Sequence, residues 1–531
     1  MSPSWAFVSR GADDLETFML INHRSALLGF CLTVLTATGS AGEPLRVYGT
    51  GTAGSGGIAP ELWANSTPRP GAGGFALRIE YGLGGASAAM LVSAGPADQN
   101  FGGLRVLVRL DRSVVLPSFQ LSGTGAGKGS ATVPLPLPNM PVLIGASFHA
   151  QAVVIDPKGA WVGIAATPGL AMTLKRPGML LATRSIGGSA DPQSAVDLAS
   201  GRMVDFSGGR IDNAHGVTFT NDGKLALVAS SLSKRYIAVC DATSFPPRYQ
   251  STIPVQGGKT SPWSVSVNPD GVRGYLVNQG PGGSGPLVEC FWVVPGSNFG
   301  KPFPGGGFDP QSISVMRLVF TPDGNTGFLS SLGIGGAPDL VRYDTKISSP
   351  TYHKVTGRTS FAGKFLFDHA ISKDGARVYV SAAPLGQLCE VAIVDAATMK
   401  IVDWDPGAPG IQNIGGEKSR PKTPLGRVVT AIAVDPRHRF VYIAVSGNSA
   451  NPTQMIRVDT DPRSSGFRSF KIYTSGLPTA AMLGGLKVSA AGDLVYLAVL
   501  GGSNVHEIDA ATLTTKRILK VHPSPNELAL R

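Results

Sequence analysis

The sequence holds few of the residues that build metal centres or disulfide frameworks. Its 531 residues include only four cysteines, Cys31, Cys240, Cys290 and Cys389. None has a neighbour at zinc-ligand spacing, and neither a Cys-x-x-Cys-His haem motif nor a vicinal cysteine pair occurs. Because Cys31 lies in the leader described below, three scattered cysteines remain, and we predict that they are buried free thiols. We expect no metal site and no cofactor.

Charged residues are also scarce, at 15%, whereas glycine (69 residues) and proline (40 residues) are abundant. This balance is typical of short strands joined by tight turns, and it excludes a mainly helical or disordered chain. The net charge is +11, but the basic residues are spread along the sequence instead of being clustered among aromatic residues. We expect a diffuse attraction to acidic polymers at most and no specific nucleic-acid partner.

Long apolar runs are missing too. The apolar run at 25–38 falls short of the roughly 20 residues that a membrane-spanning helix needs. His23 and Arg24 precede it and small residues up to Ala41 follow it, as in a signal peptide whose translation starts at Met19. We predict a leader at 1–41, no transmembrane span, and a monomeric protein that is secreted, periplasmic or on the cell surface. An uncleaved anchor or a buried strand is the alternative.

Residues 45–175 alternate short apolar runs with glycine and proline. Strands are predicted at 75–81, 89–93, 104–110 and 150–155, and the glycine-rich segment 123–129 is predicted as a turn or flexible loop. A phosphate-binding loop is excluded at Gly127-Lys128, because the prolines that follow forbid the helix that such a loop needs. The segment therefore predicts a Gly-rich β-sandwich-like domain.

A repeat begins further along the chain. An apolar strand, a turn written Pro-Asp-Gly or a variant of it, and a second apolar strand occur at 215–230, 263–278, 316–331, 367–382, 430–445 and 484–499. Successive turns are 48 to 63 residues apart, which suits four-stranded propeller blades with long loops. A second motif, a strand that ends in aspartate, follows most copies of the repeat, as at Asp395 and Asp509. We expect these aspartates to bond the backbone of their own hairpins.

Six full copies are visible, yet seven blades are predicted. Residues 524–531 resemble the first strand of a copy that does not continue. Residues 194–204 resemble the strand that ends in aspartate, without the strand–turn–strand motif before it. Pairing of the C-terminal strand with residues 179–206 completes a seventh blade and leaves no exposed sheet edge. The expected fold is all-β, with a seven-bladed β-propeller at 178–531 after the Gly-rich domain. A competing interpretation starts the ring earlier, with 152–164 as strand–turn–strand.

The turn, the Tyr-Val or Tyr-Ile strands at 378–380 and 441–443, and the Asp-Ala-Ala-Thr hairpins at 395–398 and 509–512 carry a resemblance. They resemble the repeats of YVTN-type (WD40/YVTN repeat-like) β-propellers, a group related to the lactonase-type seven-bladed propellers. The resemblance covers residues 178–531 and implies the fold. It implies little about activity, because one propeller scaffold carries many functions.

Propellers of this kind bind ligands at the mouth of the central channel. Counting eight residues back from each turn predicts that the mouth is lined by Asn526, His215, Trp263, Met316, Phe367, Thr430 and Gly484, with Asp212, Asn213, Arg317, Asp368 and His369 nearby. The binding candidates are His215, Trp263, Arg317, Asp368, His369 and Asn526, and no residue is assigned as catalytic. Capping of strand ends by the histidines and core packing by Trp263 are the alternatives.

Two functions are compatible with these residues. The first is a binding scaffold for a protein or glycan of the cell envelope, which fits the leader and the chemically mixed ring. The second, implied by the resemblance, is a lactonase-like hydrolase, whose relatives place His, Arg and Glu at the mouth. His215 or His369 and Arg317 then fill the first two roles, and only Asp212 or Asp368 replaces the glutamate. A base and a cation for the developing oxyanion are what such a reaction needs.

Export predicts a cleaved N-terminus. N-terminal sequencing of the protein recovered outside the cytoplasm should begin at Gly42 or close to it, because small residues at 39 and 41 occupy the positions that signal peptidase reads. Recovery of the chain in the cytosol with Met1 intact would contradict this prediction.

Overall fold

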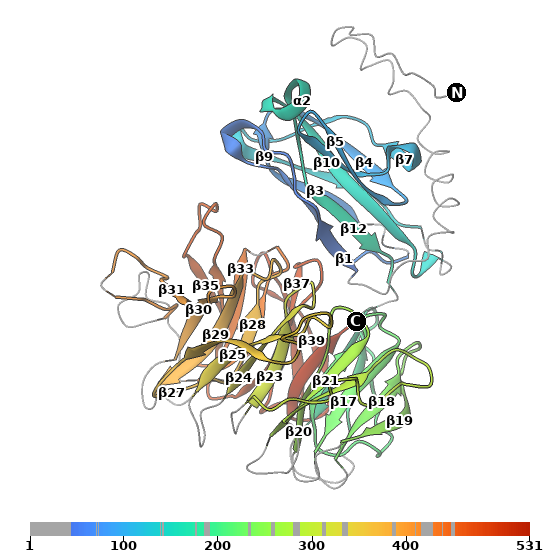
Figure 1. Ribbon diagram of the computed structural model, residues 1–531, viewed down its shortest axis with the longest axis vertical. Coiled ribbons are helices and arrows are strands. Elements are labelled where there is room, and N and C mark those ends of the chain that lie inside the picture. The colour runs from blue at the N-terminus through green and yellow to red at the C-terminus, as the bar shows by residue number, and fades with distance from the viewer. Residues whose placement is uncertain are drawn as a thin grey trace. The chain divides into compact units, whose positions relative to one another are not determined.

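The computed structural model describes residues 44–70, 72, 74–138, 140, 143–175, 178–184, 192–231, 235–255, 261–279, 287–310, 315–331, 338–384, 389–408, 410–415, 428–437, 439–447 and 452–531. These residues form two compact units, 44–175 and 178–531 (Figure 1). The predicted leader, with Cys31 and the cleavage site, lies outside the described residues. Among the residues described, no helix is long and apolar enough to cross a membrane.

The first unit consists of two larger sheets and a hairpin. One sheet has the order β1 (Leu45–Tyr48), β12 (Gly169–Thr173), β10 (Ser147–Gly159), β4 (Ser87–Ser93) and β7 (Ser113–Val115), with β11 (Ile164–Ala166) on β10 and β8 (Phe119–Gln120) on β4. The other has the order β2 (Glu61–Ala64), β3 (Ala76–Gly84) and β9 (Gly125–Pro134). The hairpin is β5 (Pro96–Phe101) and β6 (Leu104–Val108), and the helical turns are η4 (Ser55–Gly57), η5 (Leu110–Arg112) and α2 (Ala160–Gly163).

An apolar core lies between these two sheets, and a second, smaller one lies between the larger sheet and the hairpin strand β6. Leu77 and Ile79 of β3 face Met90 of β4 and Leu170 of β12, and all four side chains are buried. Alternate residues of the strands point into the core between the sheets, and β6 covers part of the other face of the larger sheet. The β-sandwich-like domain predicted from the sequence is confirmed.

Two expectations for this unit were wrong. The segment 123–129 is not all loop, because β9 begins at Gly125 and pairs with the glycine-rich end of β3. A Cβ at Gly129 would lie 2.7 Å from the carbonyl oxygen of Leu83, so the glycines allow two backbones to approach closely. The competing start of the propeller at 152–164 is also wrong, since β10 and β11 pair with each other inside the sandwich.

The second unit consists of seven sheets, and each sheet is one blade of a propeller. From the inner strand outward, the first three blades are β16 (Ala214–Phe219), β17 (Leu225–Ser230), β18 (Tyr236–Asp241) and β19 (Arg248–Pro254); β20 (Ser261–Val267), β21 (Arg273–Gln279) and β22 (Val288–Trp292); and β23 (Val315–Phe320), β24 (Thr326–Ser331), β25 (Asp339–Asp344) and β26 (Val355–Ser360). The fourth and fifth are β27 (Lys364–Phe365) and β28 (His369–Ile371) with β29 (Arg377–Pro384), β30 (Glu390–Asp395) and β31 (Ile401–Val402); and β32 (Val428–Val434), β33 (Phe440–Ser446), β34 (Gln454–Asp459) and β35 (Phe470–Tyr473). The last two are β36 (Leu483–Val488), β37 (Leu494–Val499), β38 (Asn504–Asp509) and β39 (Thr515–Lys520); and β40 (Pro525–Leu530), β13 (Met179–Arg184), β14 (Ser194–Asp197) and β15 (Met203–Asp205).

The two ends of the propeller sequence join in one blade. Strand β40 pairs antiparallel with β13, with Leu530 opposite Leu180 and Ala529 opposite Leu181. The inner strands then contact one another in the closed order β40, β16, β20, β23, β28, β32, β36 and back to β40. This is the seventh blade expected from the sequence.

Glycine makes the last contact of this ring possible. A Cβ at Gly484 would lie 2.5 Å from the carbonyl oxygen of Pro525, and one at Gly485 would lie 2.8 Å from the backbone nitrogen of Leu528. Any larger side chain at these two positions of β36 would therefore collide with the backbone of β40. The Gly-Gly pair that begins the sixth copy of the repeat is therefore where the ring closes.

The conformation of the repeated turns requires the residue types that the repeat conserves from blade to blade. The turn glycines have φ between 67° and 73° at Gly223, Gly271, Gly324, Gly375 and Gly492, a conformation that side chains disfavour. Asp395 and Asp509 accept backbone and hydroxyl hydrogen bonds from the Thr398 and Thr512 three residues on. Those bonds hold the pKa of both aspartates below the usual range. The prediction that they act locally is confirmed.

The inner strands share one irregularity near the start. Register shifts lie at Ala214/Val217, Pro262/Ser264, Val315/Leu318, Val429/Ala431 and Leu483/Leu486, and opposite β40 at Ala182/Arg184. In the fourth blade the inner strand is divided into β27 and β28. Such an extra residue changes which side chains face the channel.

Closure can be tested by adding one methyl group. Replacing Gly485 by Ala should lower the unfolding free energy by about 1–3 kcal/mol, the usual range for overpacking, because β40 must move away from β36. Gly501→Ala is the matched control, since nothing lies within 4 Å of a Cβ there, and it should change stability by less than about 0.5 kcal/mol. Chemical denaturation measures both. Equal stability of the two variants, or wild-type melting after deletion of Pro523–Arg531, would contradict closure by β40.

Candidate binding site in the central channel

Charged side chains from four blades are coupled in the central channel. Arg317 of β23 forms an ion pair with Asp368, which directly precedes β28, with 3.2 Å between Nη1 and Oδ1. Lys487 of β36 pairs with Glu527 of the closing strand β40, with 2.9 Å between Nζ and Oε1. Glu527 also acts electrostatically on Arg317 and Asp368, so the two pairs form one cluster of two cations and two anions. We call these four residues the channel cluster.

The channel walls remove most of the solvent from this cluster. Between 7% and 28% of each side chain is exposed. Burial raises the pKa of Asp368 although Arg317 opposes the shift, and burial together with Arg317 lowers the pKa of Lys487. Burial also disfavours ionised Glu527, but Lys487 and Arg317 outweigh it and hold its pKa below the usual range. The cluster is therefore held together by its own opposite charges.

Asp368 has a further role. Its Oδ2 accepts a hydrogen bond of 2.8 Å from the backbone N–H of Ile432 on β32. It thus links the third, fourth and fifth blades at the channel wall.

An aromatic pair lines the wall on two other blades. The rings of His215 on β16 and Trp263 on β20 are stacked with centroids 4.1 Å apart, and both residues are partly exposed. The Nε2 of His215 lies 3.2 Å from the side-chain amide of Asn213, which places the proton of the neutral ring on Nδ1. Burial lowers the pKa of His215 to about 4, so the ring is uncharged at neutral pH.

Gly216 explains how this pair comes together. A Cβ at Gly216 would lie 2.7 Å from the Cα of Ser264, so β16 and β20 approach each other closely beside the two rings.

Several predicted site residues lie elsewhere. His369 is fully buried, and its Nε2 bonds the carbonyl oxygen of Phe328 in the third blade, so it joins two blades and cannot meet a ligand. Asp212 is also buried and accepts hydrogen bonds from Ser230 and Tyr236. Among the other ring positions, Phe367 packs into a core between blades, and Asn526 contributes backbone to the contact with Gly484.

Sequence reasoning missed two members of the channel cluster. It placed Gly484 and Asn526 at the mouth, whereas the charges come from Lys487 and Glu527, three residues and one residue further on. The register shifts near the start of β36 and β40 move the facing position along the strand. Glu527 thus lies in the channel, although the candidates drawn from the sequence do not include it. The signal that could have found it is the charged residue directly before Leu-Ala-Leu on the inner strand β40.

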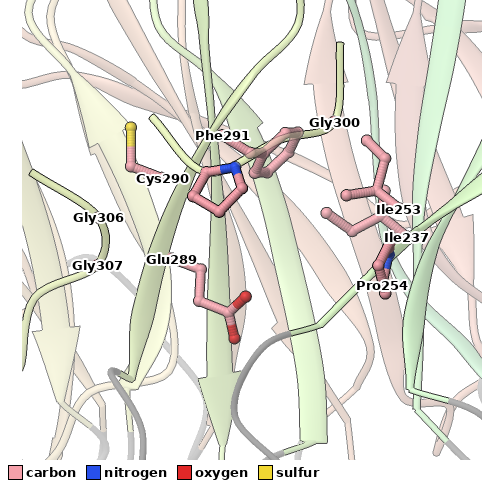
Figure 2. Close-up of a pocket in the computed structure, with 10 residues that line it drawn as sticks. Ile237, Ile253, Pro254, Glu289, Cys290, Phe291, Gly300, Gly306 and Gly307 are labelled. Atoms are coloured by element: carbon pink, nitrogen blue, oxygen red, sulfur yellow. The ribbon is translucent and has the colours of Figure 1, made fainter. Parts of the chain in front are cut away.

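A small cavity between the first two blades is not a ligand site. Figure 2 shows Ile237 and Ile253 on one side and Glu289 and Cys290 on the other. Its volume of about 10 Å³ has room for one water at most. Burial raises the pKa of the Cys290 thiol to about 12, so it is not a reactive thiolate. The described cysteines, Cys240, Cys290 and Cys389, are free and buried as predicted.

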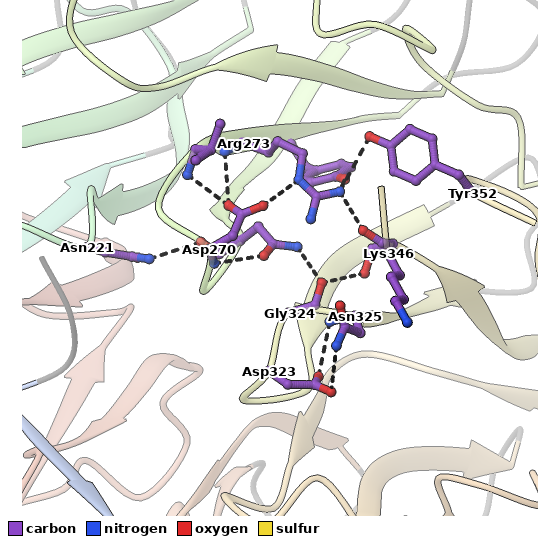
Figure 3. A network of polar contacts seen from close by, with 12 residues as sticks. Asn221, Asp270, Arg273, Asp323, Gly324, Asn325, Lys346 and Tyr352 are labelled. Atoms are coloured by element: carbon purple, nitrogen blue, oxygen red, sulfur yellow. Dashed lines mark hydrogen bonds and ion pairs between the residues drawn. The ribbon is translucent and has the colours of Figure 1, made fainter. Parts of the chain in front are cut away.

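A second polar network, shown in Figure 3, joins the turns of successive blades. Asn221 donates to the carbonyl oxygen of Asn268, and Asn268 in turn donates to that of Gly324, at 3.0 and 2.9 Å. Arg273 pairs with Asp270 at 2.6 Å and bonds the carbonyl oxygen of Thr345. Since these groups satisfy one another at turns, they hold neighbouring blades together and offer no chemistry. Within the described ranges no group of three His, Cys, Asp or Glu side chains is arranged to hold a metal ion.

The chain is similar to candidate 6-phosphogluconolactonases from Bacteroides uniformis (15% identity, TM-score 0.48) and Bacteroides fragilis (16%, 0.46), over 67% of this chain and 99% and 97% of theirs. It is also similar to the β-propeller domain of Myceliophteria thermophila Cps50 (12% identity, TM-score 0.41), over 60% of this chain and 91% of that one. No protein-family model matches the sequence, and no curated protein matches it. The seven sheets, whose inner strands contact one another in a closed ring, make the second unit a seven-bladed β-propeller.

The channel cluster predicts a specific dependence of stability on pH. Lys487→Met should lower the unfolding free energy at pH 7 by about 1–3 kcal/mol, because Glu527 loses its partner in a partly buried site. Since the folded pKa of Glu527 is below its usual value, its contribution is present above the unfolded pKa of about 4.3 and disappears as pH falls through the folded pKa. The difference between wild type and variant should therefore shrink below about pH 4.

Urea denaturation at several pH values measures this effect. Glu527→Gln and the double variant complete a mutant cycle, in which we expect a coupling of at least about 0.5 kcal/mol. Independent effects of the two substitutions, or a difference that does not change with pH, would contradict the pairing.

Proposed function

We propose that this protein is an exported or cell-surface β-propeller that serves as a binding scaffold and captures a glycan or protein of the cell envelope at its channel mouth. One observation carries this proposal. The four charges of the channel cluster are paired with one another and sum to zero, with Arg317 held by Asp368 and Lys487 held by Glu527. Such pairing hinders a nucleophile or base that must exchange partners during a reaction. It is compatible with a polar surface that binds a ligand.

The aromatic pair supports a glycan in particular. His215 and Trp263 are stacked, partly exposed and uncharged at neutral pH, so they offer an apolar ring surface beside polar groups. A ligand with an apolar face and many hydroxyl groups matches that combination. Arg317 and Lys487 then supply donors from the channel, and Asp368 and Glu527 supply acceptors.

A second candidate is a lactonase-like hydrolase, and one observation favours it. The pKa of Asp368 is raised and that of Lys487 is lowered. Both shifts bring the pKa of a channel residue closer to neutral pH. Displaced pKa values of this kind gather at active sites. Arg317 would face the developing oxyanion, and Asp368 or Glu527 would act as the base. His369 has no part in this candidate, because it is buried between blades.

Substitution of Trp263 tests the binding scaffold. Trp263→Ala should weaken binding to purified envelope glycan or to the captured envelope protein by about tenfold or more, as expected for an aromatic anchor. Trp292→Ala is the matched control, since Trp292 lies on an outer strand of the same blade and packs on Phe303. Titration calorimetry measures the affinities. Equal binding by both variants, or no binding to either kind of envelope component, would contradict the proposal.

A screen of lactones and esters separates the two candidates. Turnover by wild type that falls about a hundredfold in Arg317→Ala or Asp368→Asn, and not in Arg358→Ala, would establish the hydrolase and overturn the scaffold. Arg358 is a suitable control because it forms an ion pair with Asp339 at 2.6 Å on the outer part of the same blade as Arg317. Uniform inactivity is the expected result.

A further inference from the structure

One end of the sandwich unit carries exposed apolar side chains. Val162 is 84% exposed, Trp161 48% and Phe101 38%. Trp161 and Val162 lie in α2, the turn between β10 and β11, and Phe101 ends β5. The rings of Phe101 and Trp161 are 6.0 Å apart, so the three side chains form one surface. We call Phe101, Trp161 and Val162 the apolar tip.

The backbone of the tip is unusual for its residues. Trp161 and Val162 have φ of 37° and 54°, in the left-handed region. This conformation is unfavourable for any side chain and most of all for a β-branched one such as valine. Glycine or asparagine would fit better, so local stability does not explain Val162. Backbone strain that persists is typical of functional positions.

The tip lies at the end of the sandwich where the chain neither enters nor leaves. Strand β1 and the end of β12 are paired, Leu45 with Met172, and the start of β10 pairs with the same end, Ser147 with Thr173. The hairpin β10–β11 therefore carries α2 to the opposite end, as Figure 1 shows for this unit.

An exposed lysine lies beside the tip, and the acidic residues near it have partners. Lys158 is exposed two residues before α2, and Lys128 is exposed on β9, whose first residues touch η4. Asp156 is buried and accepts hydrogen bonds from the Ser55 backbone N–H and hydroxyl, and Asp98 pairs with Arg105. Residues 44–175 contain nine basic and five acidic residues. The apolar tip therefore has an exposed lysine beside it, in a unit whose charged residues sum to a net positive charge.

We propose that the apolar tip inserts into the interfacial region of a lipid bilayer that contains anionic lipids. A convex surface of Trp, Phe and Val matches the headgroup boundary, where aromatic rings are favoured, and Lys128 and Lys158 attract anionic headgroups. This inference does not depend on the function of the propeller channel.

Vesicle flotation tests the proposal with the full-length protein. Wild type should float with vesicles of 30% phosphatidylglycerol in phosphatidylcholine, and far less with phosphatidylcholine alone. The double variant Trp161→Ser/Val162→Ser should partition about tenfold more weakly or worse, because it loses most of the inserted apolar area. Val115→Ser is the control, since Val115 is 52% exposed on β7 of the same unit, and it should behave as wild type.

A second variant separates binding from folding. Val162→Gly should melt at a higher temperature than wild type, because glycine removes the left-handed strain, and yet bind vesicles less well. No flotation of wild type, equal flotation of the double variant, or equal binding to neutral and anionic vesicles would overturn the proposal. Concentration-dependent self-association that the double variant abolishes, without vesicle binding, would overturn it in favour of a protein interface.

Discussion

The pairing of β40 with β13 is the constraint on which the propeller depends. Seven blades enclose a channel only if the last inner strand joins the first blade, and here that strand is the final segment of the chain. The same strand carries Glu527, which pairs with Lys487 on the adjacent β36. Closure and the channel cluster are therefore parts of one structure. If β40 detaches from the ring, its ladder with β13 is lost and the partly buried Lys487 loses its counter-charge, so the two losses occur together.

The channel cluster also stabilises the centre of the ring. Asp368 accepts an N–H from β32 while it pairs with Arg317 of β23, so three successive blades meet at one carboxylate. Opposite charges of equal number allow four ionised groups to lie in a poorly solvated channel, where an unpaired one would shift its pKa and lose its charge. This balance lets the described part of the channel wall carry four charged groups that neutralise one another. It also limits the chemistry, because each group is already committed.

The fold was predictable from the sequence because its signals are local. A turn glycine with φ near 70° and an aspartate that bonds its own hairpin are determined by a few neighbouring residues, and they recur in each blade. The site was less predictable, because facing positions depend on register. Counting from the turns located Arg317, Asp368, His215 and Trp263, but the shifts in β36 and β40 moved the other two charges to Lys487 and Glu527. His369 was misassigned for the same reason: a neighbour of Asp368 on a strand points the other way, into the blades.

The two units differ in how each holds its candidate surface. In the channel, regular strands position His215, Trp263 and the charged groups, and neighbouring groups satisfy most of their polar atoms. At the apolar tip, a turn holds Trp161 and Val162 in a strained conformation with their side chains in solvent. Strain and exposure both oppose folding stability, so packing within the sandwich gives no reason for them. The apolar tip is unfavourable in water and becomes favourable only where a partner covers its apolar area. The exposed Lys158 beside it is the reason for proposing an anionic lipid bilayer as that partner.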